Sequence, residues 1–326
     1  MAQNIDVKNK RILSELDNSP NISLSQLAKK CKISPQVCEY RLKHLVEEKI
    51  IYRFYTLIDA GKLGFTSFRI HIKLKNISEE NYTKFAKHLF ENYPTFWIGF
   101  VSGNFDIIAD IFAKNPNEFE LLLSRIIEEN KQFIYSYEIM PILEMNLYQY
   151  GYFIDRKITK KGIILHKIDS LIVIDSKDIA ILKEIKNNSR LTYEHIGRKV
   201  GLTRNAVKYR INAMEKNKVI AGYKIFVDYK SFDKTSWKIF VKYDNSKIDQ
   251  EKMLLAYLKE FDGVLATTKH LGRWNIDIEM QIRDARELQK FIITLRNKFS
   301  IIEQYEIVQL LEDYGIDFFP DSLKVK

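Results

Sequence analysis

The 326-residue sequence lacks the features that would place it in a membrane or in an oxidising compartment. Its only cysteines are Cys31 and Cys38, too few for a disulfide framework or a cysteine-rich zinc site. No apolar run approaches the roughly 20 residues that span a bilayer, and the polar N-terminus has no apolar stretch typical of a secretory signal. We therefore expect a cytoplasmic protein with no membrane partner.

Motifs for catalysis and cofactor binding are also missing. The sequence contains no HExxH pair, no P-loop, no Rossmann glycine fingerprint and no GxSxG elbow, and its six histidines are scattered. Both cysteines fall at apolar positions of expected helices, where packing explains them better than nucleophilic chemistry does. We therefore predict no enzymatic activity, no catalytic residues, no cofactor and no metal site.

What the sequence does contain is a long internal repeat. Shifted by 169 residues, Asp6–Asp59 lies on Asp175–Asp228 without a gap. The same offset holds at Gly103 and Gly272, and it is one residue shorter near the end of each copy. Because apolar and polar positions coincide over so long a stretch, we infer a tandem duplication of a unit of about 145 residues, which suits two small domains.

The first part of each unit predicts a winged helix-turn-helix. In copy one, helices are expected behind Asp6, Ser23 and Ser34, which all suit an N-cap, and Pro35 suits the first helical turn. The stretch IIYRFYTLID that follows is typical of a strand. Copy two repeats this order. Three helices are expected after Asp175, Thr192 and Thr203, and a strand over VIAGYKIFVD follows them.

The second part of each unit predicts a ferredoxin-like domain. Copy one shows strand patterns at 66–74, 96–101, 105–112 and 134–143 and helix patterns at 79–91 and 116–129. Copy two shows strand patterns at 236–243, 264–271, 274–282 and 301–310 and helix patterns at 250–261 and 285–299. The order βαββαβ describes an antiparallel sheet with two helices on one face. Because we expect the other face to be apolar, we expect the copies to pair through it.

The chain is thus predicted to be α+β, with two winged helix-turn-helix domains each followed by a ferredoxin-like domain in an intramolecular pseudo-dimer. The DNA-binding type domains are expected at 1–60 and 175–228, the ferredoxin-like effector domains at 61–150 and 229–316, and a tail at 317–326. Residues 151–174 are poor in glycine and serine, so we expect an ordered connector there.

Positive charge is concentrated in the two helix-turn-helix segments. Residues 6–59 hold ten basic and seven acidic side chains, and residues 175–228 hold twelve and six. These segments carry +9 of the formal net charge of +10. Solvated helix faces alone would not explain why the excess follows one domain type twice. The distribution is typical of proteins that bind nucleic acid.

The third helix of each copy is the expected recognition helix. Cys38, Leu42 and Leu45 should face the three-helix core, as should their counterparts in copy two. The opposite face carries amide, charged and tyrosine side chains that suit base edges in the major groove. Flanking arginines and the hydroxyls at the helix N-termini suit phosphates. The predicted DNA-binding residues are Ser34, Gln36, Glu39, Tyr40, Arg41, Lys43, Thr203, Arg204, Asn205, Lys208, Tyr209, Arg210 and Asn212.

These stretches resemble the Lrp/AsnC, or feast/famine, family of prokaryotic transcription regulators. The resemblance is carried by ISPQVCEYRLKHLVEEKIIYRFYTLID and LTRNAVKYRINAMEKNKVIAGYKIFVD. In addition, VSGNFDIIADI and HLGRWNIDIEM resemble the Gly-x-x-Asp loop of the family's effector domain. The resemblance covers both copies apart from the connector and the last residues. It implies double-stranded DNA binding by dimers whose effector domains bind small molecules, often amino acids.

The same resemblance implies a set of effector-binding residues, namely Gly103, Asn104 and Asp106 in copy one and Gly272, Arg273 and Asn275 in copy two. Asn275 stands where the family usually has an aspartate, so the two loops need not be equivalent. Each glycine also suits a tight turn between adjacent strands, and this is the interpretation that we favour for both.

Duplication changes what the operator must look like. Two joined units can form in one chain the pseudo-dimer that single-unit relatives form from two, because the connector raises the effective concentration of each half. Glu39 in copy one stands where copy two has Lys208, so a palindrome is not required. We predict an asymmetric site with half-sites about one helical turn, or a multiple of it, apart. The family also predicts homo-oligomers that form through the effector domains.

Two other functions remain to be weighed. Siroheme decarboxylases resemble Lrp/AsnC proteins, sometimes occur as fused pairs, and use His and Arg side chains around a tetrapyrrole with many carboxylates. His270 and Arg273 fall in the corresponding loop of copy two, whereas copy one has Phe100 and Asn104. The second alternative is a scaffold whose winged helices contact protein, and it predicts little salt dependence of any DNA binding.

Overall fold

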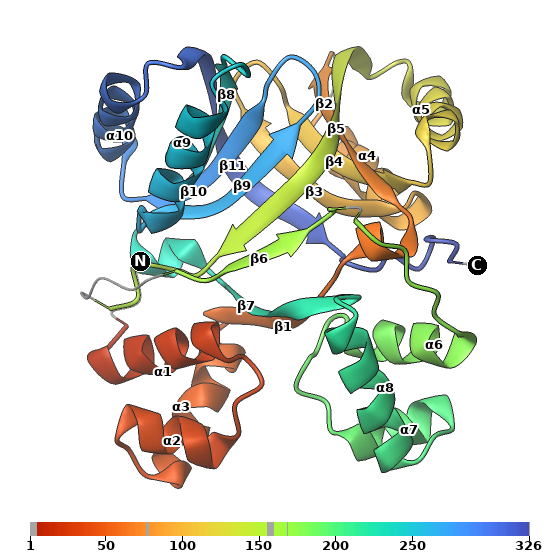
Figure 1. Ribbon diagram of the computed structural model, residues 1–326, viewed down its shortest axis with the longest axis vertical. Helices are drawn as coiled ribbons and strands as arrows, with labels where there is room; N and C mark the ends of the chain where they lie inside the picture. The colour runs from red at the N-terminus through yellow and green to blue at the C-terminus, as the bar shows by residue number, and fades with distance from the viewer. Residues whose placement is uncertain (1–4, 76–77, 155–159, 168, 326) are drawn as a thin grey trace.

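The two copies fold alike in the computed structural model, which describes residues 5–75, 78–154, 160–167 and 169–325 (Figure 1). Three helices open copy one: α1 (Val7–Asn18), α2 (Leu24–Cys31) and α3 (Pro35–Glu47). Three open copy two: α6 (Ser176–Ile185), α7 (Tyr193–Val200) and α8 (Arg204–Lys216). The three N-caps predicted in copy one are confirmed, since each side chain accepts a hydrogen bond from a backbone N–H of the first turn. Asp175, Thr192 and Thr203 cap the helices of copy two in the same way.

The strand that follows each helical unit pairs with its counterpart in the other copy. β1 (Ile51–Ile58) and β7 (Ile220–Val227) form an antiparallel two-stranded sheet, hereafter the wing sheet. Tyr55 lies opposite Lys224, the residue that stands 169 positions later in the repeat. An approximate twofold axis therefore passes through this pair. Short 3-10 helices at Ala60–Leu63 and Tyr229–Phe232 lead from the wing sheet into the second parts.

The second parts have the predicted βαββαβ order. Copy one contains β2 (Thr66–Leu74), α4 (Glu79–Asn92), β3 (Thr95–Ser102), β4 (Ile107–Ala113), α5 (Pro116–Asn130) and β5 (Ile134–Tyr148). Copy two contains β8 (Thr235–Tyr243), α9 (Ile248–Glu260), β9 (Val264–His270), β10 (Ile276–Ile282), α10 (Ala285–Lys298) and β11 (Ile302–Ile316). The two last strands, β5 and β11, run five and six residues past their predicted ends at 143 and 310.

The two four-stranded sheets close into one barrel. The strand order is β5-β2-β4-β3 in copy one and β11-β8-β10-β9 in copy two, and β3 pairs with β11 while β9 pairs with β5. Helices α4, α5, α9 and α10 lie on the outside of this barrel (Figure 1). The expected pairing of the copies is confirmed, and it uses the sheet edges as well as the faces. Because every edge strand of a four-stranded sheet finds a partner, the barrel hides the edges that invite aggregation.

The inner face of the barrel corrects one prediction. Along β2, Phe68, Ile70 and Ile72 pack against the helices, whereas the alternating positions Arg69 and His71 point to the barrel interior. The interior does contain an apolar cluster from both copies. It also buries several charged side chains, so our expectation of an apolar inner face was wrong.

The connector forms one further strand, β6 (Gly162–Leu165), which pairs with the end of β5. Its buried Lys160 donates hydrogen bonds to the carbonyls of Phe261, Asp262 and Val264 in copy two. The connector is thus ordered, as expected, over 160–167 and 169–174, while 155–159 and 168 lie outside the described residues. None of the helices formed by the described residues has the length and apolar character that a membrane crossing requires.

Candidate nucleic-acid interface

Each recognition helix is built from a cap, a buried stripe and an exposed face. The hydroxyls of Ser34 and Thr203 accept hydrogen bonds from backbone N–H groups of α3 and α8, respectively. The expected apolar stripes are confirmed, because Cys38, Leu45 and their counterparts are buried and Leu42 packs against the core. Solvent reaches the opposite faces, whose exposed side chains are Gln36, Glu39, Tyr40 and Lys43 on α3 and Arg204, Asn205, Lys208, Tyr209 and Asn212 on α8.

The large aromatic side chains on these faces are unusual for free helix surfaces. Tyr40 is 70% exposed and Tyr209, its counterpart, is 75% exposed. The Tyr40 ring lies 6.4 Å from the ring of His44 on the same helix, and both tyrosines remain largely exposed to solvent. Such rings suit contacts with sugars, thymine methyl groups or base edges. Their placement agrees with the predicted interface without testing it.

Arg41 and Arg210 have internal partners that the sequence did not indicate. Arg41 donates to Asp6 at 2.6 Å and to Asn9 at 2.9 Å, which ties α3 to the start of α1. Arg210 makes the equivalent bonds to Asp175 and Asp178, both at 2.8 Å. These two carboxylates raise the pKa of Arg210. Both arginines thus fix the position of the recognition helix, and their contact with phosphate stays a prediction.

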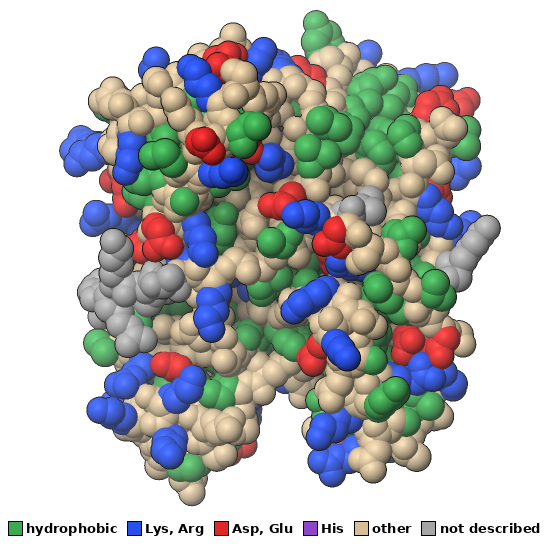
Figure 2. All heavy atoms as spheres, in the orientation of Figure 1, with side chains coloured by type: hydrophobic (Ala, Val, Ile, Leu, Met, Phe, Trp, Pro, Cys, Tyr) green, Lys and Arg blue, Asp and Glu red, His purple; other side chains and the backbone are tan. Residues whose placement is uncertain are grey.

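The exposed faces of α3 and α8 differ in charge. Lys43 lies 3.6 Å from Glu47 on its own helix, and Glu39 adds a second carboxylate to that face. On α8 the corresponding pair of positions carries Lys208 and Asn212, and no carboxylate among the described residues lies within ion-pairing distance of Lys208. Figure 2 shows Lys and Arg side chains on both helical units, at the end of the molecule away from the barrel. The second unit therefore presents the more basic recognition surface.

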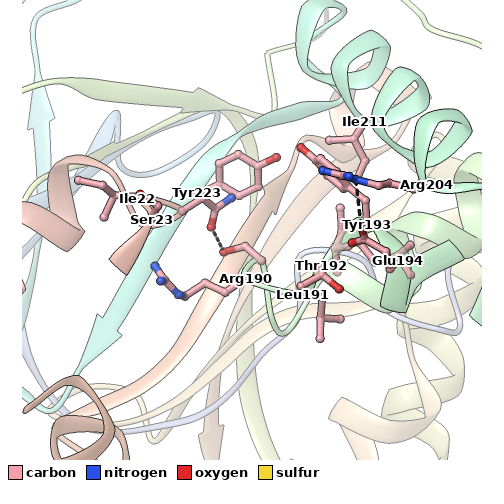
Figure 3. A pocket seen from close by; sticks show the side chains of 14 residues that line it. Ile22, Ser23, Arg190, Leu191, Thr192, Tyr193, Glu194, Arg204, Ile211 and Tyr223 are labelled. Carbon is pink, nitrogen blue, oxygen red and sulfur yellow. Dashed lines mark hydrogen bonds and ion pairs between the residues drawn. The ribbon is translucent and has the colours of Figure 1, made fainter. Parts of the chain in front are cut away.

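The two helical units also contact each other near the twofold axis. Arg190 donates to the carbonyl of Pro20 at 2.5 Å, and the Ser189 hydroxyl donates to Asn21 at 2.7 Å. Positions 189 and 190 are the repeat counterparts of 20 and 21, so each loop contacts its own equivalent. A cleft of about 360 Å³ runs between the units, with Ile22 and Ser23 on one side and the segment from Arg190 on the other (Figure 3). Together with the wing sheet, these contacts fix one recognition helix relative to the other.

The predicted effector loops are satisfied from within the protein. Gly103 and Gly272 have φ values of +141° and +128°, as expected for tight turns between strands. Asp106 accepts a hydrogen bond from the backbone N–H of Leu74 at 2.7 Å, and Asn275 does the same for Tyr243 at 2.7 Å. The aspartate and the asparagine thus perform the same structural task at the end of β2 and of β8.

The remaining loop residues join the two copies. Asn104 donates to Glu306 at 3.0 Å, and Arg273 donates to Glu138 at 2.7 Å. These two contacts are equivalent under the repeat. They supply hydrogen bonds across the β3–β11 and β5–β9 junctions, which accounts for these side chains without a ligand, although effector binding itself stays a prediction.

The barrel interior holds a buried ion network that spans the two copies. Arg69 makes two hydrogen bonds of 2.7 Å to the Asp110 carboxylate and a third bond to Asp277 of the other copy. Lys238 lies 2.8 Å from Glu279 and 3.8 Å from Asp277. Burial alone would raise the pKa of Asp277, but Arg69 and Lys238 hold the pKa of that carboxyl well below its ordinary value.

The two residues on which the decarboxylase alternative depends lie apart. His270 is buried in the barrel and lies 2.8 Å from Asp277, and burial lowers the pKa of its imidazole. The guanidinium of Arg273 is about half exposed on the outside. The strand register also places Val101, and not Phe100, at the counterpart of His270, because Val101 faces Leu310 as His270 faces Ile142.

Metal and thiol chemistry find no support in the described residues. Over these ranges no group of three or more His, Cys, Asp or Glu side chains is arranged to hold a metal ion. Cys31 and Cys38 are both buried, and burial together with the nearby Cys38 raises the pKa of Cys31 to about 11. Because the Cys31 thiol is rarely ionised, this side chain is suited to packing and not to nucleophilic chemistry, as its apolar position on the helix predicted.

Both helical units match known families of DNA-binding domains. Residues 174–215 match the AsnC-type helix-turn-helix domain, and residues 5–52 match a winged helix-turn-helix DNA-binding family. An uncharacterised HTH-type transcriptional regulator of Pyrococcus horikoshii is 32% identical over 145 residues, which is 43% of this chain and 93% of that protein. The transcriptional regulator AzlB of Bacillus subtilis is 31% identical over 35% of this chain and 74% of its own length. Such relatives are less than half as long as this chain, as the duplication requires.

Comparison with solved structures finds the whole tandem arrangement. The crystal structure of the siroheme decarboxylase NirDL superposes with a TM-score of 0.64 over 95% of this chain and 92% of its own. The two sequences are 12% identical in that alignment. At that identity the similarity establishes a shared fold and leaves the chemistry to be argued from the residues.

Proposed function

The chain belongs to the Lrp/AsnC family of helix-turn-helix regulators, and on this basis we propose that it binds double-stranded DNA sequence-specifically through α3 and α8. The observation that carries this proposal is the pairing of two exposed polar recognition faces on one end of a single chain (Figure 1). The large exposed apolar side chains on these helices are few, namely Val37, Tyr40 and Val46 on α3 and Tyr209 on α8. Their amide, lysine and tyrosine side chains are those that read base edges.

The proposed operator is asymmetric. The two helical units are held by the wing sheet and by the loop contacts of Ser189 and Arg190, so their separation is set by the protein. Half-sites are then expected about one helical turn, or a multiple, apart. Because Glu39 and Lys208 occupy equivalent positions, the two half-sites differ in sequence.

The tetrapyrrole enzyme is the rival function, and the residues favour it less. A substrate with many carboxylates needs a cation-rich cavity. The cavity of about 630 Å³ between the wing sheet and the barrel is instead lined by three cationic side chains and by four carboxylates, namely Asp228, Glu279, Glu312 and Asp313. The lining contains no histidine. His270, the expected histidine, is instead engaged with Asp277 inside the barrel.

The experiment that tests the proposal is selection of bound fragments from random duplex DNA by the full chain. We expect the recovered site to contain two unlike half-sites. We also expect the chain to retard that duplex in a gel at about nanomolar to micromolar protein concentrations, a range that includes the affinities of specific DNA binding. In parallel, the protein is incubated with siroheme and its absorbance is followed. Recovery of no sequence above background, together with a stoichiometric change in the siroheme spectrum, would overturn the proposal in favour of the enzyme.

A further inference from the structure

We propose that the cavity between the wing sheet and the rim of the barrel binds a small organic cation, an amine attached to an aromatic or apolar body. The cavity has a volume of about 630 Å³ and is bounded by β1, β7 and the end of β11. That volume lies in the range of sites for small molecules, and barrel mouths are among the places where such sites occur.

On the other side of the twofold axis, the place equivalent to this cavity is filled by the connector. There, β6 of the connector pairs with the end of β5, from Met145 opposite Leu165 to Tyr148 opposite Gly162. β6 also reaches the wing sheet, since a Cβ atom on Gly222 would lie 2.8 Å from the side chain of Ile163. The connector therefore wedges between barrel and wing sheet on one side of the twofold axis.

On the other side the equivalent wedge is not supplied by any described segment. Residues 313–316 of β11 are the counterparts of the β5 residues that hold β6. They pair with β3 on one edge, and the pairing with β8 on the other edge stops at Leu310. Within the described ranges no strand occupies that edge, and Glu312–Ile316 line the cavity instead.

Substitutions between the copies enlarge the open side. His166 of the connector fills the closed side, with its ring 5.1 Å from that of Phe96 and 5.6 Å from that of Phe112. The repeat counterparts of these phenylalanines are Leu265 and Gln281, and both line the cavity. Ala266, also in the lining, is likewise the counterpart of the much larger Trp97. The space is thus built into the second copy and is not left over from loose packing.

The walls of the cavity are rich in aromatic rings and carboxylates. Seven aromatic rings line the cavity: Tyr52, Tyr55, Phe90, Tyr150, Phe226, Tyr229 and Tyr314. Glu312 and Asp313 add carboxylates with no cation of the described residues within ion-pairing distance, and Asp313 accepts a hydrogen bond from the Trp97 indole at 2.7 Å. Rings around unpaired carboxylates are the arrangement that binds an ammonium group.

Two of the three cations in the lining have hydrogen-bond partners, and the third, Lys230, lies 6.0 Å from the centre of the Tyr229 ring. Lys224 donates to the carbonyl of Tyr148 at 2.6 Å and lies 3.6 Å from Asp17. Arg53 donates to Asn187 at 3.1 Å. The Glu279 carboxylate raises the pKa of Asp313, so a bound cation would also relieve the charge repulsion at this carboxyl.

A ligand here would connect the barrel to the recognition helices. On the closed side the connector braces the wing sheet against the barrel, and an occupant of the cavity would brace the open side in the same way. This consequence, unlike the binding itself, rests on the proposed DNA-binding function. Occupancy would then narrow the range of orientations of the two helical units and change DNA affinity.

The test is titration calorimetry of the full chain with tyramine, an aromatic amine. Its anionic analogue of similar size, 3-(4-hydroxyphenyl)propionate, serves as the ligand control. We expect saturable binding of one tyramine per chain and no saturable binding of the anion. Glu312→Gln should weaken tyramine binding about tenfold, since it removes an unpaired carboxylate from the wall. Its counterpart Glu144→Gln, on the closed side, should leave binding unchanged.

A second variant fills the space without changing charge. Ala266→Trp places in the cavity the residue that the first copy has at the equivalent position, and it should abolish tyramine binding while the chain still binds duplex DNA. Absence of saturable binding by the unmodified chain, equal binding of the anion, or equal effects of Glu312→Gln and Glu144→Gln would overturn the proposal. Binding of tyramine without DNA binding would contradict the proposed function and leave the cavity site intact.

Discussion

The two halves of the barrel share a backbone and differ in what they bury inside it. Copy one contributes Arg69 with Asp110, and copy two places Lys238 and Glu279 at the same positions. Copy two adds Asp277 and His270, where copy one has Ile108 and Val101, and copy one adds His71, where copy two has Phe240. The Arg69–Asp277 contact therefore exists only when unlike halves meet. Divergence after duplication has made each half a specific partner for the other.

The same comparison holds outside the barrel. One recognition face carries Glu39 and the other carries Lys208, and one side of the wing sheet is closed by the connector while the other is open. Positions that fix the fold are equivalent in both halves, such as Arg41 with Arg210 and Asp106 with Asn275. The contacts that hold each recognition helix and each loop are thus symmetric, whereas the buried ion network and the surfaces that face a ligand or DNA are not.

The largest effect is expected from breaking the ion network on the side of copy one. Arg69→Met leaves the buried carboxylates of Asp110 and Asp277 without their guanidinium, so we expect a loss of about 3–5 kcal/mol in the free energy of unfolding. Lys238→Met should cost less, about 1–3 kcal/mol, because Glu279 is partly exposed and water can reach it. Urea denaturation followed by circular dichroism measures both. Equal losses would mean that the network is not centred on the cross-copy contact.

The second largest effect is expected at the connector, which closes one side of the wing sheet and buries His166 there. Burial lowers the pKa of this imidazole to about 4, below its ordinary value of 6.5, so the unfolded chain binds the proton first. The stability that neutral His166 contributes is complete above pH 6.5 and is lost as the pH falls toward 4. From pH 7 to pH 5 we expect the unmodified chain to lose about 2 kcal/mol more than His166→Asn does.

Asparagine is the replacement of choice because His166 has a φ of +67°, which Asn tolerates well. Asp59 and Asp313, whose pKa values are raised to about 6, respond in the opposite direction and are present in both proteins, so they cancel in the difference. If the two proteins show parallel pH profiles of stability, the imidazole is hydrated in the folded state and the connector does not seal the closed side.

The recognition helices offer a smaller difference. Lys208→Ala removes an unpaired lysine from α8 and should weaken binding to the selected duplex about tenfold, with relaxed base preference in one half-site. Lys43→Ala should weaken it less, because Lys43 already lies near Glu47. Competition in gel retardation with duplexes altered in one half-site at a time measures this. Loss of preference in neither half-site would show that these faces do not read bases.

The smallest effect concerns the arginines that hold the recognition helices. Arg210→Ala breaks two partly exposed ion pairs, so we expect a loss of about 0.3–1 kcal/mol in the free energy of unfolding. Arg41→Ala breaks one ion pair and one hydrogen bond to an amide, and it should cost less than Arg210→Ala. Thermal unfolding under matched conditions compares them. A larger cost for Arg41→Ala would contradict the assigned contacts.

Local sequence signals predicted the elements well because their causes are local. Caps such as Ser34 and Thr203 fix helix starts through bonds within one turn, and the repeat predicted two copies of one fold. The exposed face of each recognition helix also followed from periodicity. The effector loops were predicted as tight turns, and the positive φ of Gly103 and Gly272 agrees.

Contacts between distant segments were not predictable in the same way. That Arg69 would meet Asp277 depends on how two sheets close into a barrel, which no spacing within either copy encodes. Arg41 was predicted to contact phosphate because its actual partner, Asp6, lies 35 residues away in the sequence, and no local pattern links the two residues. The open cavity arises from a difference between copies, Ala266 against Trp97, whose meaning depends on where the connector lies.

The most direct test of the account is the salt dependence of binding to the selected duplex. Affinity is measured between about 50 and 200 mM salt, with a slope near −0.9 in log–log form for each phosphate contacted. We predict a steep slope that corresponds to several phosphates, contributed by both helical units of one chain. A flat response, or equal affinity for a duplex with either half-site removed, would contradict the claim that this tandem chain reads DNA with two unlike recognition helices.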